Sequence, residues 1–314
     1  MSKILCIVGP TASGKTKLSI ALAHLTGGEI VSADSMQIYK YMDIGTAKPS
    51  PEEREGIPHH MMDFLDPSID YSAAEYFADA SAKIDDILSR GKLPIVVGGT
   101  GLYFDTLTGT VSFDEDGGGD EAVRARLWAE YEQNGADALH AKLASIDPQS
   151  AETIHKNNVK RVIRAIEVYE LTGRTMSERI REAKNRPPRY EALTIGLTTS
   201  DRDILYGRID HRVDLMMEMG LEEEARLIYN RDLGQTAKQA IGYKELFAYF
   251  EDRCSLREAV AAVKQESRRY AKRQLTWFKR NSQIQWIEFD KSVNFQNVLE
   301  NAREKLCNYG IMDL

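Results

Sequence analysis

The sequence predicts an α/β fold, in which a parallel sheet core is interrupted by a helical insertion domain. Two observations predict the core. Apolar strand-like runs alternate with helical segments over the first hundred residues, and glycine-rich turns follow the first and third of these runs. This alternation is typical of parallel sheets with ligand loops at the carboxyl ends of the strands. A third observation predicts the insertion, because every periodic segment from residue 122 to about 184 has helical spacing.

The first strand and helix come at the start of the chain. Residues 3–8 are apolar after Lys3 and rich in β-branched side chains, and residues 15–25 have apolar positions at helical spacing. Gly27 follows that helix and ends it. The run GEIVSADS then predicts a second strand that ends at Asp34.

A second helix and a third strand complete this alternation. Residues 72–90 predict a helix that Ser72 caps and Gly91 closes. The run LPIVVGGTG predicts a third strand with a glycine turn directly after it. The order strand, helix, strand, helix, strand therefore supports the parallel sheet.

The pattern changes after residue 112. The acidic run FDEDGGGDE at residues 113–121 predicts a flexible loop, Asp147-Pro148 begins a helix, and Gly173 ends another. A proline break in NRPPRYEALTIGLT leads back to a strand at residues 193–197. Long helices at residues 201–229 and 255–280 and a strand-like QIQWIEF segment follow. We therefore expect a discontinuous core, residues 1–113 with 188–314, that carries an insertion domain at residues 114–187.

Composition limits the class of protein. Of 314 residues, 42% are hydrophobic and 28% are charged, as in ordinary globular domains. The first apolar run is too short for a signal peptide or a membrane span, and the three cysteines are far apart, so we expect a cytoplasmic protein without membrane attachment. The net charge of −7 argues weakly against nucleic-acid binding, but basic residues are locally clustered.

The turn after the first strand matches the motif G-x-x-x-x-G-K-[ST] in full, between a strand and a helix. Its backbone N–H groups and the helix N-terminus favour an anion, the lysine adds a full charge, and the final threonine hydroxyl can hold Mg²⁺. We therefore expect a P-loop NTPase-like core that binds a diphosphate through Gly9, Pro10, Thr11, Ala12, Ser13, Gly14, Lys15 and Thr16. The motif does not identify the reaction, and a purely structural turn is the alternative.

The carboxylate that usually completes a P-loop metal site is absent from its usual place in the sequence. P-loop ATPases and GTPases have an Asp after another apolar strand, but residues 93–97 are followed by glycines. The strand that ends in an acid is the second one, which ends at Asp34. Asp34 is thus a candidate for holding a metal through water or for acting as a general base. Capping a turn is its structural alternative.

Several segments together resemble one family. The segments GPTASGKT, SADSMQIYKYMDIGTAKPS, IPHHMMDFLDP, YSAAEYFADA, IVVGGTGLY, NNVKRVIRAIEVYELTG, AIGYKE and YAKRQLTWFKR resemble, in this order, those of the tRNA dimethylallyltransferases, also called tRNA isopentenyltransferases. The resemblance spans nearly the whole chain. It implies transfer of a dimethylallyl group from dimethylallyl diphosphate to the exocyclic amine of adenosine 37, beside the anticodon, in tRNAs that read codons beginning with U.

The resemblance also implies catalytic roles. Asp34 matches the family's catalytic aspartate and would remove a proton from the adenine amine. Lys15 and a Thr16-bound Mg²⁺ would stabilise the departing diphosphate, with Thr11 and Ser13 as further contacts. Arg212 matches a family arginine that supports the diphosphate, and a surface ion pair with Asp201 or Asp214 is its structural alternative.

The tRNA contacts are expected in three places. Residues 264–280 hold seven basic side chains against one acid, and a second basic stripe runs along a helix of the insertion domain from Asn157 to Arg164. By family match, the acceptor site itself includes the residues after the second strand, those around QAIGYK, and Thr100. The expected tRNA-binding residues are Asp34, Ser35, Met36, Gln37, Thr100, Arg124, Lys160, Arg161, Val162, Ile163, Arg164, Gln239, Ala240, Ile241, Gly242, Tyr243, Lys244, Arg269, Lys272 and Arg273.

Two other functions remain open at this point. One is a small-molecule or nucleoside kinase that uses ATP, in which Asp34 would deprotonate a hydroxyl. The other is a nucleotide-switched RNA-binding protein without bond-forming chemistry. His59-His60 is expected to be structural, because adjacent histidines cannot easily ligate one metal. We expect a monomer that acts on the tRNA anticodon stem-loop.

Overall fold

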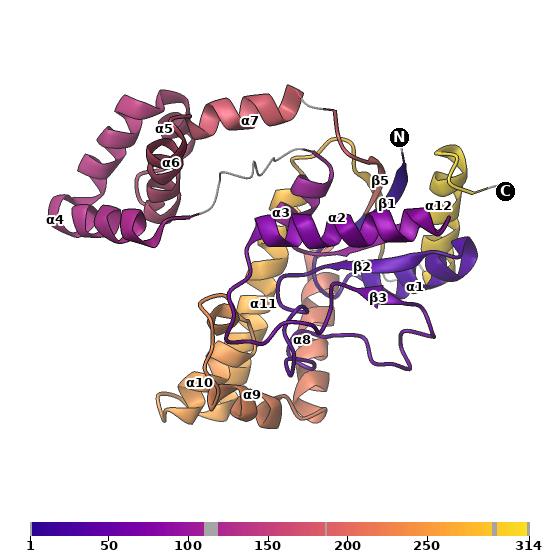
Figure 1. Ribbon diagram of the computed structural model, residues 1–314. Coiled ribbons are helices and arrows are strands. Elements are labelled where there is room, and N and C mark those ends of the chain that lie inside the picture. The colour runs from indigo at the N-terminus through magenta and orange to yellow at the C-terminus, as the bar shows by residue number, and fades with distance from the viewer. Residues whose placement is uncertain (1, 110–118, 186, 291–293, 313–314) are drawn as a thin grey trace. The chain divides into compact units, whose positions relative to one another are not determined.

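The computed structural model describes residues 2–109, 119–185, 187–290 and 294–312 (Figure 1). Within these residues, six strands form one parallel sheet in the order β3-β2-β4-β1-β5-β6. The parallel α/β core predicted from the sequence is confirmed. The strands are β1 (Lys3–Val8), β2 (Glu29–Ala33), β3 (His59–His60), β4 (Pro94–Gly98), β5 (Glu191–Thr198) and β6 (Gln285–Glu288).

Helices pack on this sheet and on one another. Helix α1 contacts β1, β2 and β4, α2 contacts β2 and β4, and α8 packs against α11. Buried apolar side chains of the strands and of α1, α8 and α12 form one hydrophobic cluster. The helices of this part are α1 (Lys15–Thr26), α2 (Ala73–Ser89), α8 (Arg202–Glu218), α9 (Leu221–Tyr229), α10 (Tyr243–Phe250), α11 (Leu256–Phe278) and α12 (Phe295–Asn308), with α3 (Gly101–Leu107) after β4.

The chain divides into two compact units. The first is Met1–Phe104 with Tyr190–Leu314, and the second is Asp105–Arg189, a wider range than the 114–187 expected from the sequence. The second unit is helical and has its own buried apolar cluster. Most of the acidic stretch 113–121 lies outside the described residues. The helices of the second unit are α4 (Glu121–Ile146), α5 (Pro148–Thr153), α6 (Val159–Thr172) and α7 (Met176–Asn185).

Local sequence signals located most helix ends correctly. Ser72 caps α2 in a full capping box with Glu75, Asp147 caps α5, and Gly173 follows α6 in the left-handed conformation. The prediction of a single long helix at residues 201–229 is wrong, because two helices, α8 and α9, occupy this range. Gly220, with φ of +99°, separates α8 from α9, because glycine readily adopts the left-handed conformation that ends a helix.

Among the described residues, none of the helices combines the length and apolar character needed to cross a bilayer.

A buried carboxylate, Glu29 at the start of β2, is the centre of a cluster of charged hydrogen bonds. Its side chain is 3% exposed and accepts hydrogen bonds from Arg90, Lys92 and His60. The Arg90 bonds, supported by those of Lys92 and His60, hold the pKa of Glu29 well below its ordinary value. His59 bonds to the Ile57 carbonyl, so both histidines have structural partners, as expected.

We expect Glu29→Gln to lower the free energy of unfolding by about 2–4 kcal/mol at pH 7, because it leaves three donors around a neutral amide. A depressed pKa stabilises the fold above the carboxyl's unfolded pKa of about 4.3, and this contribution is lost as the pH falls below it. Urea denaturation should therefore show the two proteins converging in stability below pH 4. The control is Glu55→Gln, since Glu55 is 61% exposed beside His24, and should change stability by less than about 0.5 kcal/mol. A pH-independent difference would contradict this account.

Candidate active site

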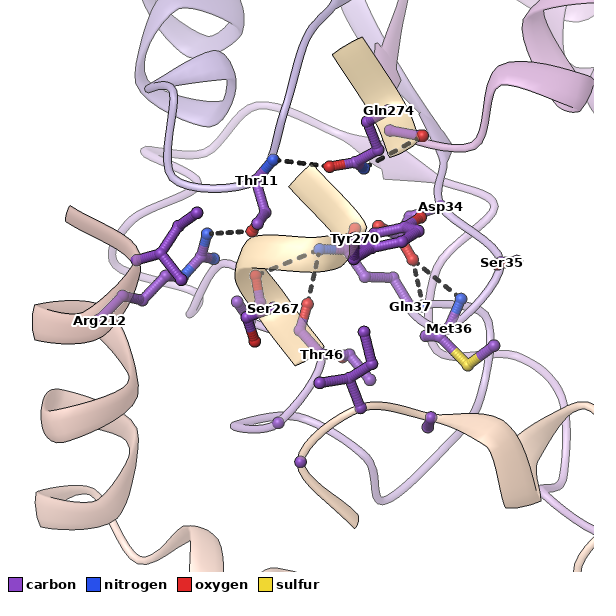
Figure 2. A pocket seen from close by; sticks show the side chains of 18 of the residues that line it. Thr11, Asp34, Ser35, Met36, Gln37, Thr46, Arg212, Ser267, Tyr270 and Gln274 are labelled. Atoms are coloured by element: carbon purple, nitrogen blue, oxygen red, sulfur yellow. Dashed lines mark hydrogen bonds between the residues drawn. The ribbon is translucent and has the colours of Figure 1, made fainter. Parts of the chain in front are cut away.

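A cavity of about 400 Å³ lies in the first unit, at the carboxyl ends of β1, β2 and β4 (Figure 2). Its walls come from the P-loop, residues 34–37 after β2, residues 45–47, residues 97–99 at the end of β4, α8, residues 239–244 and α11. The structure therefore brings together residues that the sequence predicted from distant motifs. The predicted residues that line the cavity are Thr11, Lys15, Thr16, Asp34, Ser35, Met36, Gln37, Arg212, Gln239, Ala240, Ile241, Gly242, Lys244 and Arg273.

The P-loop joins β1 to α1 as the motif predicts. Gly9 has φ of +146°, and a Cβ there would lie 2.6 Å from the Leu197 carbonyl oxygen, so only glycine fits. The Lys15 ammonium bonds to the Pro10 carbonyl at 2.7 Å, across the mouth of the loop. The Ser13 hydroxyl is buried and has no hydrogen-bond partner among the described residues. The loop is thus a concave set of donors in front of a helix N-terminus.

Thr11 is held from two sides. Its backbone N–H donates to Gln274 Oε1 at 2.9 Å, and its hydroxyl accepts from Arg212 at 3.3 Å (Figure 2). Gln274 on α11 also donates to the Gly99 carbonyl at 3.1 Å. The sequence predicted that Thr11 contacts the diphosphate through its backbone or its hydroxyl; because the backbone N–H already donates to Gln274, the hydroxyl is the group left for that predicted contact. Sequence reasoning missed Gln274, although it lies between Ala271 and Phe278 on the apolar side of the basic helix.

Two cations of the cavity face a common space. Burial, and then repulsion from Arg212, lower the pKa of Lys15 to about 7, against a smaller attraction from Asp34. Burial likewise lowers the pKa of Arg212. Arg212 bonds to Thr11 and pairs with neither Asp201 nor Asp214, so the surface ion pair considered from the sequence is not formed. Two cations beside P-loop donors are suited to a multiply charged anion.

Asp34 stands at the end of β2, beside this cationic region. Its Oδ1 accepts the backbone N–H of Met36 at 2.9 Å and that of Gln37 at 3.4 Å, so Asp34 does cap a turn. No hydrogen bond to its Oδ2 is formed by the residues that the structure describes. Thr100 holds the next residue, because its hydroxyl accepts from the Ser35 backbone N–H at 3.1 Å. The cap fixes one carboxylate oxygen and leaves the other for a ligand.

Tyr270 on α11 is a cavity residue that the sequence analysis did not identify. Burial, followed by the nearby charge of Asp34, raises the pKa of the Tyr270 hydroxyl, and hydrogen bonds with Thr100 and Gln274 act in the opposite direction. Arg273 lies 5.7 Å from the centre of its ring. Tyr270 is therefore a neutral hydroxyl group close to Asp34. No sequence motif distinguished it from the other aromatic residues of the helix.

The cavity offers oxygen ligands for one small cation. Thr16 supplies a hydroxyl and Asp34 a carboxylate, and both line the same cavity as Lys15. Among the described residues, no group of three His, Cys, Asp or Glu side chains forms a metal site. Mg²⁺ commonly uses one or two protein oxygens together with phosphate oxygens and water, so this donor set fits Mg²⁺ that arrives with a phosphate ligand.

Some predicted tRNA-binding side chains are unavailable. Val162 and Ile163 are 1% and 3% exposed in the apolar cluster of the second unit, and Tyr243 is fully buried. The prediction that the Val162 and Ile163 side chains contact tRNA is wrong, because helical spacing cannot tell a basic stripe from the apolar stripe beside it. For Tyr243, which the family match gave as a tRNA contact with a structural role as the alternative, the burial favours the structural role. Gln37 lines the cavity, but its amide already bonds to Ser32, Thr46 and Ala47.

The basic helix faces differ from one another in their partners. On α11, Lys264 and Arg268 pair with Asp214 and Asp210 of α8, and thereby fasten the two helices together. Further along, Lys272 and Arg273 are exposed, and Arg269 pairs with Glu266 of its own helix. In the second unit, Lys160 and Arg161 are exposed, whereas Arg124 and Arg164 both pair with the buried Glu167.

Arg208, one turn before Arg212 on α8, has a different environment. Its guanidinium lies 4.4 Å from the centre of the Phe289 ring, and it does not line the cavity. Of these two arginines, only Arg212 belongs to the site.

Known proteins similar to this chain belong to one family. A family model described as IPP transferase matches residues 37–281. The tRNA dimethylallyltransferase of Acetivibrio thermocellus is 48% identical over 99% of both chains. The crystal structure of a full-length tRNA isopentenylpyrophosphate transferase from Bacillus halodurans is 43% identical, with a TM-score of 0.73 over 98% of this chain and 96% of that one. The structure of a eukaryotic dimethylallyltransferase acting on tRNA is 30% identical, with a TM-score of 0.83 over 99% of this chain and 80% of that one.

Proposed function

The chain belongs to the IPP transferase family, and from this premise we propose that its cavity transfers a dimethylallyl group from dimethylallyl diphosphate to the exocyclic amine of adenosine 37 in tRNA. The enzyme is a tRNA-modifying prenyltransferase, in agreement with its relatives. One observation carries the finer proposal. An anion cradle and a half-bonded carboxylate, Asp34, line a single cavity. A kinase that uses ATP is not favoured, because none of the relatives described above is a kinase.

The cradle is suited to a leaving diphosphate. In the proposed reaction the bond between C1 of the allyl group and the bridging oxygen breaks, and negative charge grows on the diphosphate. Lys15, Arg212 and the P-loop N–H groups stabilise that charge where it develops. When bound, Mg²⁺ would be held by the Thr16 hydroxyl and would supply a further positive charge on the diphosphate oxygens, which leaves Asp34 for the acceptor. No phosphoryl group is transferred.

Asp34 is suited to the acceptor side. The adenine amine is a weak nucleophile because its lone pair is delocalised into the ring, so removal of a proton helps the new N6–C1 bond to form. Asp34 Oδ2 takes that proton, while Oδ1 remains bonded to the turn. The turn bonds fix the direction of the carboxylate before the substrate arrives.

The acceptor must leave its stack in the RNA to enter the cavity. Exposed cations beside the cavity, Lys272 and Arg273 on α11, are placed to meet the RNA backbone. Lys160 and Arg161 give the second unit an exposed basic face of its own. We propose that both faces bind the anticodon stem-loop, and that the enzyme acts as a monomer in the cytoplasm.

A single assay separates this reaction from a kinase. The protein is incubated with Mg²⁺, an unmodified anticodon hairpin, and either dimethylallyl diphosphate or ATP. We expect free diphosphate and N6-dimethylallyladenosine in equal amounts with the first donor, and no turnover with the second. Formation of ADP without a prenylated nucleoside would contradict the proposed function.

Donor binding should depend on the protonation of Lys15. Because the pKa of Lys15 is lowered to about 7 in the free protein, the ammonium is lost above that pH, and binding must first restore its proton. We expect the affinity for dimethylallyl diphosphate to fall by about tenfold per pH unit above pH 7, measured by calorimetry.

Lys15→Met should abolish this slope, whereas Lys17→Met, which removes a cation beside the Phe295 ring, should keep it. Equal slopes in the wild type and Lys15→Met would show that the diphosphate, not Lys15, titrates.

A further inference from the structure

One carboxylate on α9 connects three segments of the chain. Glu224 Oε2 accepts the backbone N–H groups of Asp43 and Ile44, both at 2.9 Å, and Oε1 accepts that of Gly45 at 3.0 Å. Oε1 also accepts the Tyr243 hydroxyl at 2.6 Å. Four donors around one carboxylate form a charge-assisted network, which is stronger than bonds between neutral groups. This hub joins residues 43–45, α9 and α10.

Tyr243 completes the hub by packing. Its ring is fully buried, and a Cβ on Gly45 would lie 2.5 Å from that ring, so only glycine allows this contact. Burial, and then the charge of Glu224, raise the pKa of Tyr243, which keeps its hydroxyl a donor. The tyrosine of the AIGYKE motif therefore has a structural role.

The segment held by Glu224 leads directly to the cavity wall. Gly45, Thr46 and Ala47 line the cavity, and the carbonyls of Thr46 and Ala47 each accept from Gln37 Nε2 at 3.2 Å. The amide oxygen of Gln37 in turn accepts from the Ser32 hydroxyl at 3.0 Å. The orientation of Gln37 is thus set by the segment that Glu224 holds.

Gln37 connects this network to Asp34. Its backbone N–H lies 3.4 Å from Asp34 Oδ1, in the same turn that Met36 closes. A continuous series of hydrogen bonds therefore runs from Glu224, through residues 43–47 and Gln37, to the turn that holds the catalytic carboxylate. The P-loop and Arg212 bond elsewhere, to Gln274 and to each other.

We propose that Glu224 is a positioning residue that holds residues 43–47 as the acceptor-side wall of the cavity. The proposal rests on the proposed function, because it assigns this wall to the adenine. Lys48 independently anchors the end of the segment to the Tyr39 carbonyl and to Asp63, so loss of Glu224 should shift the wall without unfolding it. A displacement of about 1 Å in a reacting group can lower turnover about a hundredfold.

Steady-state kinetics tests this role. In Glu224→Gln the side-chain NH₂ group would face backbone N–H groups. It cannot accept hydrogen bonds from them, because it is itself a donor. We expect kcat/KM for an anticodon hairpin to fall by about 10- to 100-fold, while the dissociation constant of dimethylallyl diphosphate changes by less than about twofold. Tyr243→Phe removes one of the four hydrogen bonds to Glu224, so its kcat/KM for the hairpin should fall only a few-fold. Glu223→Gln, at the exposed neighbouring position, should behave as the wild type.

Hydrogen exchange gives a readout independent of activity. The amides of Asp43, Ile44 and Gly45 should exchange faster in Glu224→Gln than in Glu223→Gln, while those of the P-loop should not change. An unaltered kcat/KM for the hairpin, or a parallel loss of donor affinity, would overturn the positioning role. A wild-type protein that fails to prenylate the hairpin would instead contradict the proposed function itself.

Discussion

Asp34→Asn should lower kcat by about 10²- to 10⁴-fold, the contribution of a positioned general base. Asparagine has the size of aspartate, and its amide oxygen can still accept the Met36 N–H that Oδ1 accepts in the wild type. What it cannot do is take the proton of the adenine amine. Single-turnover measurements with saturating donor and hairpin would isolate this step.

The control for this substitution is a second capping aspartate. Asp66 accepts the backbone N–H of Ser68 in a surface turn, in the same way as Asp34 does for Met36, but lies outside the cavity. Asp66→Asn should leave kcat unchanged. For Asp34→Asn, the affinity for the hairpin should change little. If kcat were unchanged, Asp34 would have only its structural role as a cap.

Arg212→Met should lower kcat/KM for dimethylallyl diphosphate by about 10²- to 10³-fold, as loss of one donor to a developing anion typically does. The guanidinium is held beside the P-loop by Thr11, and its charge faces the space in front of Lys15. The defect should appear in turnover with the diphosphate donor, whereas binding of the hairpin alone should be retained.

Arg208→Met is the matched control, because it removes the same group from the same helix one turn earlier. Arg208 stacks on Phe289 and does not line the cavity, so we expect its substitution to change kcat/KM for dimethylallyl diphosphate by less than about threefold. An equal fall of kcat/KM in both variants would mean that the overall positive charge of α8, and not a direct contact of Arg212, stabilises the bound diphosphate.

The parts of the site that the sequence predicted are those encoded by short contiguous patterns. The P-loop needs glycine at a fixed position, because the backbone at Gly9 approaches the Leu197 carbonyl too closely for a Cβ. Asp34 was found because it directly follows an apolar strand. Parallel strands place such residues at one edge of the sheet, so order along the chain was enough to bring Asp34 and Lys15 together.

The parts that the sequence missed are contacts between distant segments. Gln274 reaches Thr11 across 263 residues, and Glu224 reaches Gly45 across 179. Neither has a motif, since a buried amide or a half-buried carboxylate is recognised only by what packs around it. The same limit explains Tyr243, which belongs to a family motif and yet faces the protein interior.

The central claim is that one cavity holds the leaving diphosphate on the P-loop while Asp34 faces an unstacked adenine. A structure of the inactive Asp34→Asn protein with dimethylallyl diphosphate and an anticodon hairpin tests it most directly. The diphosphate should lie within hydrogen-bond distance of Lys15 and Arg212, and the adenine amine within hydrogen-bond distance of the side chain at position 34. A diphosphate bound elsewhere, or an adenine still stacked in its loop, would contradict the claim.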